Sequence, residues 1–141
     1  MPANFGHRVL PCLLVSDMRR SLEFYVETLR FVQTGYYPIA SEPNFTEVRR
    51  DDVAIILFTE PIHGREQLPT FSGALYLFPP AIDHIADELR GMVPFAWGPN
   101  VTEFGLREFA IRDPDGYTIV FAERSSPHTH GEVLKSSDAN V

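Results

Sequence analysis

Few side chains in this sequence have the types and spacing that catalysis or metal binding requires. No Ser/His/Asp or Cys/His arrangement for nucleophilic catalysis can be assembled from it. Cys12 falls within an apolar stretch, VLPCLLV, and is expected to be a core residue. His128 and His130 have a spacing suited to chelation, but they stand in a polar stretch where solvated histidines are the simpler interpretation. The other histidines lie in three separate segments and form no cluster: His7, His63 and His84.

The most suggestive charged residue is Glu108, in the stretch REFAIRDPDGYTIVFAER over residues 107–124. This stretch predicts two strands joined by a tight turn, in which Pro114 fixes one φ angle and Gly116 supplies a positive one. A bulge at such a turn shifts the side-chain parity, so the bulky residues of both strands share the face that should pack against a helix. A smaller, mixed set then faces the other way, toward a concave cavity: Glu108, Ala110, Thr118 and Val120.

The elements that must position this hairpin are predicted to occur in the same order twice. The first half should contain a strand, a helix capped by Asp17 and three more strands, at 9–15, 18–30, 31–37, 44–50 and 52–59. The second half should contain a strand at 74–78, a helix opened by Pro79–Pro80, a strand near 93–97 and then the hairpin. The apolar face of that second helix is formed by Ile82, Ile85, Leu89 and Met92.

Two short matches between the halves support an internal duplication. Arg50–Asp51 and Arg112–Asp113 stand 62 residues apart. The segments LFTE at 57–60 and VFAE at 120–123 stand 63 residues apart, and a small insertion in one turn explains the difference. Together with the repeated order of elements, these matches favour two copies of one strand–helix–three-strand unit.

The element order also predicts the domain organisation. We expect one domain over 1–124, with a first module at about 8–60 and a second at about 74–124. The polar segment 61–73, which contains Gly and Pro, is the predicted linker between them. The final segment, 125–141, is polar and has no periodicity, which is typical of a flexible tail.

The composition excludes several classes of partner. A length of 141 residues with 44% hydrophobic content is enough for one domain with its own core. The net charge of −7 argues against a nucleic-acid partner. The sequence has no apolar run long enough for a membrane span and no predicted secretory signal, and its single cysteine suits a reducing compartment. We therefore expect a cytoplasmic protein with neither a membrane nor a nucleic acid as its partner.

Two stretches, VLPCLLVSDMRRSLEFYVETLRF and REFAIRDPDGYTIVFAE, together resemble the vicinal oxygen chelate superfamily. This superfamily includes glyoxalase I, ring-cleaving dioxygenases and bleomycin resistance proteins, and the likeness over residues 8–124 is greatest to the bleomycin-resistance branch. The resemblance implies an α+β fold of two tandem βαβββ modules, which form curled mixed sheets around a concave cavity. It also implies a homodimer with grooves shared between the chains. The sequence leaves open whether the modules pair within one chain or swap between two.

The metal-ligand positions of that superfamily carry side chains that cannot bind a metal ion. Carried over by the resemblance, these positions fall on Pro11, Leu57, Ala74 or Leu75, and Val120. A divalent ion needs imidazole, thiolate or oxygen ligands, and none of these side chains provides one. The resemblance therefore implies no metal and no other cofactor, and it favours a binding protein over an enzyme.

The resemblance and the strand parity together predict a groove lined by apolar and aromatic residues around a carboxylate. The expected ligand-binding residues are Glu108, Phe104, Trp97, Tyr76, Leu57, Val120 and Tyr37. Such a groove suits a cationic or aromatic small molecule. The predicted function is antibiotic resistance by drug binding, in which the protein sequesters an antibiotic-type ligand.

Other interpretations of these residues stay open at the level of sequence. Trp97 is equally suited to closing a strand end, Tyr76 to facing the helices, and Glu108 to pairing with Arg107 or Arg112. The protein as a whole could instead be a metal-dependent glyoxalase- or dioxygenase-like enzyme with ligands outside the usual set. It could also be a structural or regulatory domain without a small ligand.

One departure from the resembled family concerns the end of the first helix. Members usually have Gly in the sequence LGF, whereas this chain has LRF with Arg30 in the middle. Glycine takes a left-handed conformation at little cost, so Arg30 must either accept strain or end the helix in another way.

Overall fold

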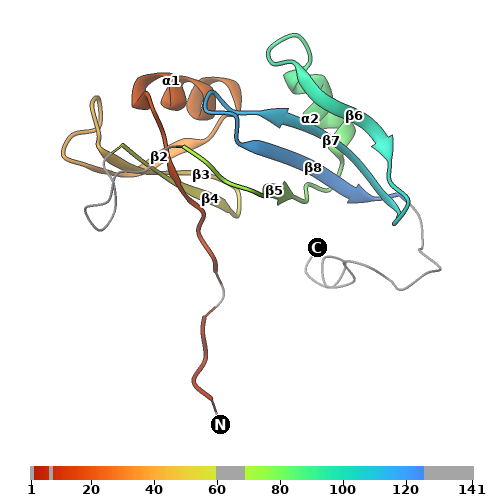
Figure 1. The fold of residues 1–141 in the computed structure, drawn as a ribbon, viewed down its shortest axis with the longest axis horizontal. Helices are drawn as coiled ribbons and strands as arrows, with labels where there is room; N and C mark the ends of the chain where they lie inside the picture. Colours follow the sequence, from red (N-terminus) through yellow and green to blue (C-terminus); the bar gives the residue numbers. More distant parts are fainter. Residues whose placement is uncertain (1, 7, 60–68, 126–141) are drawn as a thin grey trace. The chain divides into compact units, whose positions relative to one another are not determined.

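The computed structural model describes residues 2–6, 8–59 and 69–125. It divides the chain into two compact units, Met1–Pro69 and Thr70–Val141, which are coloured from red to yellow and from green to blue in Figure 1. No helix within the described ranges is long and apolar enough to cross a membrane. Residues 61–68 of the expected linker 61–73, the tail beyond residue 125 and four of the five histidines lie outside the described residues.

The first unit has the predicted order of one strand, a helix and three strands. Its elements are β1 (Cys12–Leu14), α1 (Met18–Leu22), the π-helix η1 (Glu23–Thr28), β2 (Val32–Tyr37), β3 (Phe45–Arg50) and β4 (Val53–Phe58). The sheet has the strand order β1-β4-β3-β2, in which β1 and β4 are parallel and the other pairs are antiparallel. The sheet is mixed because the helix carries the chain from β1 to β2, on the far side of the β3–β4 hairpin.

The second unit repeats this topology. Its elements are β5 (Ala74–Leu77), α2 (Ile82–Leu89), β6 (Phe95–Val101), β7 (Leu106–Arg112) and β8 (Thr118–Arg124). The strand order is β5-β8-β7-β6, with β5 and β8 parallel and the remaining pairs antiparallel. The predicted fold of two tandem βαβββ modules is therefore confirmed.

Several element boundaries differ from the prediction. The predicted helix 18–30 divides into α1 and η1, because the backbone changes to wider π-helical turns at Glu23. Pro79–Pro80 precede α2 rather than opening it, and Met92 lies beyond its end with half of its surface exposed. The strand predicted near 93–97 runs from Phe95 to Val101.

The prediction that Cys12 is a core residue is wrong. Cys12 is exposed, although it opens strand β1. The inward face of this short edge strand is instead formed by Leu13, which is paired with Leu57 and is 5% exposed. Leu14, which has the same side-chain parity as Cys12, is also buried at 9% exposure, so the exposure is confined to the first residue of β1.

The start and the end of the first helix follow the sequence signals. The side chain of Asp17 accepts a hydrogen bond from the backbone N–H of Arg20 at 3.1 Å, as predicted for an N-cap. Arg30 has a φ of +62°, so it accepts the left-handed conformation that glycine would take there. The guanidinium of Arg50 donates to the carbonyl of Leu29 at 2.9 Å and ties this helix end to β3.

The hairpin between β7 and β8 forms as predicted. Gly116 has a φ of +86°, and its N–H donates to the carbonyl of Asp113 at 2.9 Å. The carboxylate of Asp113 also accepts from the backbone N–H groups of Asp115 and Tyr117, both at 2.9 Å. The register that results pairs Phe109 with Phe121, Ala110 with Val120 and Ile111 with Ile119.

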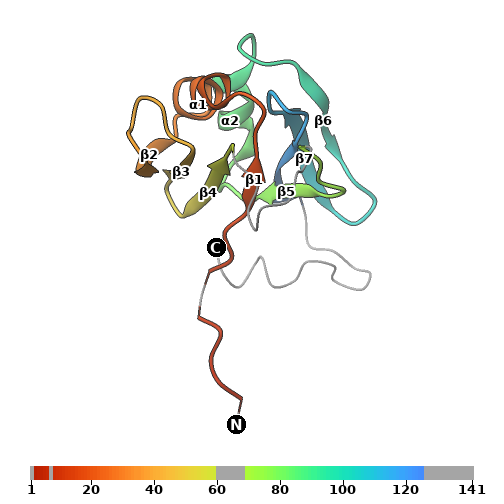
Figure 2. The same ribbon diagram turned by 60° about the vertical axis from the view of Figure 1, so that its left-hand side comes forward.

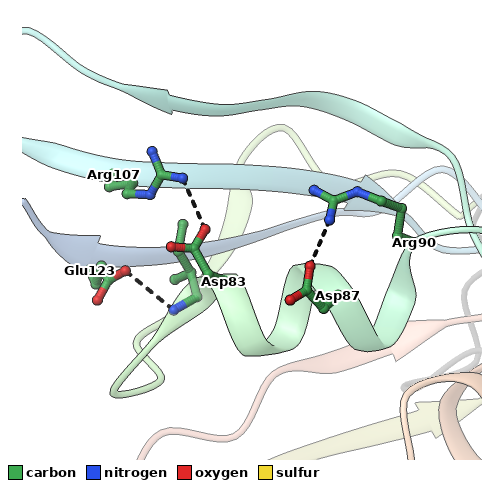
Figure 3. A network of polar contacts seen from close by, with 6 residues as sticks. Asp83, Asp87, Arg90, Arg107 and Glu123 are labelled. Atoms are coloured by element: carbon green, nitrogen blue, oxygen red, sulfur yellow. Dashed lines mark hydrogen bonds and ion pairs between the residues drawn. The ribbon is translucent and has the colours of Figure 1, made fainter.

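The bulky face of this hairpin packs toward α2, which lies beside β7 and β8 in Figures 1 and 2. Phe95, Phe109 and Phe121 stack across three strands, with ring centroids 4.7 and 5.0 Å apart. Polar contacts hold the helix to the same face (Figure 3). Arg107 donates to Asp83 at 2.9 Å, and Glu123 accepts from the N–H of Ile82 at 3.3 Å. The predicted parity is therefore confirmed, and the Glu108 side of the hairpin faces away from α2.

Candidate functional site

Glu108 lies near the middle of β7 on the sheet face opposite α2. It is opposite Asn100 of β6 and Ala122 of β8, and only 3% of its surface is exposed. A carboxylate so deeply buried requires hydrogen-bond donors or a cation to stabilise its charge.

Two aromatic side chains supply hydrogen bonds to this carboxylate. The indole Nε1–H of Trp97 donates to Oε2 of Glu108 at 3.1 Å, and the hydroxyl of Tyr76 donates to the same oxygen at 3.4 Å. Trp97 belongs to β6 and Tyr76 to β5, the two edge strands of the sheet. Glu108 therefore joins residues from the opposite edges of one sheet.

The strand register explains how the two aromatic side chains reach Glu108. Tyr76 is paired with Val120, Val120 with Ala110, and Ala110 with Trp97, so these four residues form one row across the sheet. The two inner residues of the row are small and fully buried. Tyr76 and Trp97, which are 41% and 39% exposed, can lean over them toward Glu108.

Gly98 allows β6 to approach β7 closely at this point. Its φ is +80°, and a Cβ atom placed on it would lie 2.4 Å from the carbonyl oxygen of Glu108 and 2.9 Å from Cα of Phe109. Strand β6 is irregular on both sides of Trp97, where its register with β7 shifts. The sequence reasoning did not identify Gly98 as part of the site, although the WGP sequence beside Trp97 was the available signal.

The charge of Glu108 has no cationic partner among the described residues. The two arginines of β7 form contacts with other residues. Arg107 pairs with Asp83 at 2.9 Å, and Arg112 donates to the hydroxyl of Thr118 at 3.2 Å. The alternative in which Glu108 pairs with one of these arginines is therefore wrong. Burial, followed by the charge of Glu108, raises the pKa of Tyr76, so its hydroxyl stays protonated and able to donate.

The structure brings four of the seven predicted ligand-binding residues onto this face of the second unit: Glu108, Trp97, Tyr76 and Val120. Trp97 lies within β6 rather than at its end, and Tyr76 faces away from α2, so both of their alternative roles are contradicted. Phe104 lies in the turn between β6 and β7 and is 38% exposed. Leu57 and Tyr37 belong to the first unit, where Leu57 is fully buried in β4 and Tyr37 is 69% exposed in β2.

Comparison with known proteins identifies the class. Residues 5–121 match the family model of the Glyoxalase/Bleomycin resistance protein/Dioxygenase superfamily, and the chain belongs to that superfamily. No curated protein matches the chain.

Solved structures share this fold. TnmS3, an antibiotic binding protein from Streptomyces sp. CB03234, is 26% identical with a TM-score of 0.70 over 88% of this chain and 100% of its own. A superfamily member from Sphaerobacter thermophilus is 26% identical, with a TM-score of 0.64 over 84% of this chain and 98% of its own. TioX from Micromonospora sp. ML1 is 12% identical with a TM-score of 0.68 over 84% and 99%, which shows the fold alone.

The residues at the expected metal positions do not fit a metal ion. The pairing of Ala74 with Thr118 and of Tyr76 with Val120 places Ala74, rather than Leu75, on the Glu108 face. Pro11, Leu57, Ala74 and Val120 have no donor atom in their side chains. Within the described part of the chain, no group of three or more His, Cys, Asp or Glu residues could hold a metal. We therefore derive no reaction step through a metal ion.

Proposed function

We propose that this protein is a metal-free binding protein for a small cationic, aromatic molecule of the antibiotic type. In this proposal it acts by sequestering the molecule, as bleomycin resistance proteins do, and it does not transform the molecule chemically. The observation that carries the proposal is the carboxylate of Glu108, which is almost completely buried and which, among the described residues, is bonded only by an indole N–H and a phenol O–H.

The first argument is electrostatic. A buried carboxylate without a counter-ion is destabilised by the loss of its hydration, and a cation placed beside it restores much of that loss. The two neutral donors, the indole of Trp97 and the hydroxyl of Tyr76, reduce the desolvation cost of Glu108 but do not neutralise its charge. A cationic ligand would therefore gain more at Glu108 than it would beside an exposed carboxylate, where water already screens the charge.

The second argument is the aromatic flank. Trp97 and Tyr76 are held in place by their bonds to Glu108, yet more than a third of each side chain is exposed. Rings fixed in this way present a surface on which a flat ligand can stack and over which a cation can lie. The antibiotic binding protein TnmS3 has the same fold at 26% identity, which adds support for an antibiotic as the ligand.

We extend the proposal to the assembly and its location. In the superfamily the binding grooves are shared between the chains of a homodimer, and Leu57, Tyr37 and Phe104 are then candidates for the remainder of the groove. The single cysteine suits the reducing cytoplasm.

The test is a titration of the purified protein with bleomycin, followed by thermal shift and by fluorescence. Trp97 is the only tryptophan of the sequence, so its emission reports directly on the site. We expect bleomycin to raise the melting temperature and change the emission, and Glu108→Gln to weaken binding at low salt by about tenfold. Glu103→Gln removes an exposed carboxylate from the turn between β6 and β7 and should leave binding unchanged.

The alternative is decided on the same sample. Elemental analysis that finds about one zinc, nickel or iron ion tightly bound per chain would favour a metal-dependent enzyme and contradict the metal-free proposal. Binding that is equally tight in wild type and Glu108→Gln would contradict the proposed role of Glu108.

A further inference from the structure

The two oxygens of the Glu108 carboxylate are not equivalent. Both the indole of Trp97 and the hydroxyl of Tyr76 donate to Oε2, and no hydrogen bond reaches Oε1 within the described residues. A carboxylate oxygen offers about two lone-pair directions. The acceptor capacity of Oε2 is therefore already used, whereas that of Oε1 is free.

The free oxygen is also accessible. In the described part of the chain, Ser21 Oγ is the only fully buried side-chain oxygen or nitrogen that lacks a hydrogen-bond partner. Oε1 of Glu108 lacks a partner as well but is not fully buried, so the small exposed fraction of Glu108 includes this atom. Oε1 therefore offers a ligand a point of contact with Glu108 that the hydrogen bonds of Trp97 and Tyr76 leave free.

This asymmetry selects among cations. A guanidinium or amidinium pairs best with a carboxylate in the bidentate arrangement, which requires one free lone pair on each oxygen. An ammonium group is a compact charge with up to three N–H donors and needs only one acceptor oxygen. The hydroxyl oxygen of Tyr76, which donates its proton to Glu108, keeps the capacity to accept a second N–H from the same ammonium group.

We infer that the cation recognised at this site is a primary or secondary ammonium group carried next to an aromatic ring, bound through Oε1 of Glu108. The inference rests on the proposed function and goes further, because it names the cation and the accepting atom. Guanidinium ligands are disfavoured since Trp97 and Tyr76 occupy Oε2. Quaternary ammonium ligands are disfavoured since they have no N–H to donate.

Four matched probes test the inference: 2-phenylethylammonium, 2-phenylethylguanidinium, trimethyl-(2-phenylethyl)ammonium and neutral 2-phenylethanol. The readouts are the emission of Trp97 and its indole N–H resonance, which is the single such resonance of this sequence. We expect the primary ammonium to bind about tenfold more tightly than each of the other three probes, the change that one charge-assisted hydrogen bond supplies.

The Tyr76→Phe variant provides a sharper readout than loss of binding. It removes one donor from Oε2 and frees a lone pair there, so the guanidinium should gain affinity relative to the primary ammonium. We expect the tenfold preference to fall to about twofold or less. Tyr36→Phe, which removes the hydroxyl of an exposed tyrosine in the first unit, should leave the preference unchanged.

The outcomes separate this inference from the proposed function. If the guanidinium or the quaternary ammonium binds as tightly as the primary ammonium, or if Tyr76→Phe leaves the preference intact, the inference is wrong and the proposed function stands. The same holds if bleomycin binds and the primary ammonium does not. If neither bleomycin nor any of the four probes changes the Trp97 signals, the proposed function fails as well.

Discussion

The indole Nε1 of Trp97 lies 3.1 Å from Oε2 of Glu108, and this bond joins the edge strand β6 to a carboxylate that is 3% exposed. It is the shorter of the two bonds that stabilise Glu108. Because Trp97 is the only tryptophan, this relationship can be followed by fluorescence and by a single NMR resonance. The emission and the indole N–H resonance of Trp97 therefore report on the local structure around Glu108.

Glu108→Gln should stabilise the protein that holds no ligand. Glutamine has the same size, and its carbonyl oxygen can accept from both Trp97 and Tyr76, but it carries no charge without a counter-ion. We expect the free energy of unfolding at pH 7 to rise by about 1 kcal/mol, measured by urea denaturation. Glu103→Gln, at an exposed position, should stay within about 0.5 kcal/mol of wild type. A clear loss of stability in Glu108→Gln would indicate that the charge is compensated in the folded protein.

Gly98→Ala should destabilise the protein and break the contact between Trp97 and Glu108. The added Cβ would meet the carbonyl oxygen of Glu108 at 2.4 Å, in addition to the strain of a φ of +80°. We expect a loss of about 3 kcal/mol in the free energy of unfolding and a shifted indole N–H resonance.

Gly91→Ala is the matched control for this substitution. Gly91 has a similar φ of +86°, but a Cβ atom there would have no neighbour within 4 Å. The free energy of unfolding of Gly91→Ala should therefore fall by only about 1 kcal/mol, from backbone strain, and the indole resonance should not change. Equal losses of stability in the two variants would mean that the close approach of β6 to β7 does not add to the destabilisation caused by Gly98→Ala.

Arg30→Gly should stabilise the first unit. Arg30 is exposed and has a φ of +62°, a conformation that glycine adopts without steric strain. We expect the free energy of unfolding, measured by thermal or urea denaturation, to rise by about 0.5–1 kcal/mol. The relief of backbone strain should exceed the entropic cost of the more flexible unfolded chain. Arg19→Gly, in the first turn of α1, should change stability in the opposite direction by about 1 kcal/mol. A destabilised Arg30→Gly variant would show that the arginine side chain contributes more than its backbone strain costs.

Alkaline stability should depend on Tyr117. Burial, followed by the charges of Asp115 and Asp113, raises the pKa of Tyr117 to about 12. The unfolded chain loses this proton first, near pH 10, so stability is complete below that value and falls as the pH rises toward 12. In Tyr117→Phe, the free energy of unfolding should fall between pH 10 and 12 by about 2 kcal/mol less than in wild type, measured by urea denaturation at each pH. Tyr36→Phe, at a position that is 56% exposed, should keep the wild-type slope.

Much of the architecture could be predicted from the sequence because the signals are local. Alternation along 107–112 and 117–122 identified which side chains of the hairpin share a face, and the pairing of Phe109 with Phe121 confirms it. The turn residues Pro114 and Gly116 determined where the chain reverses. The spacing of apolar residues and the conformational preferences of turn residues act over a few neighbouring positions. They therefore predict local structure without knowledge of the rest of the fold.

The features that only the tertiary structure decided depend on residues far apart in the chain. The register of β5 against β8 placed Tyr76 and Ala74 on the Glu108 face. The sequence of this four-residue strand did not decide which of its side chains would lie on that face. The register shifts around Trp97 in β6, which Gly98 permits, brought its indole to Oε2. The tertiary structure likewise decided that Cys12 is exposed while Leu13 and Leu14 of the same strand are buried. A shift of one residue in register reverses which side chains face which side, and contacts between distant strands set that register.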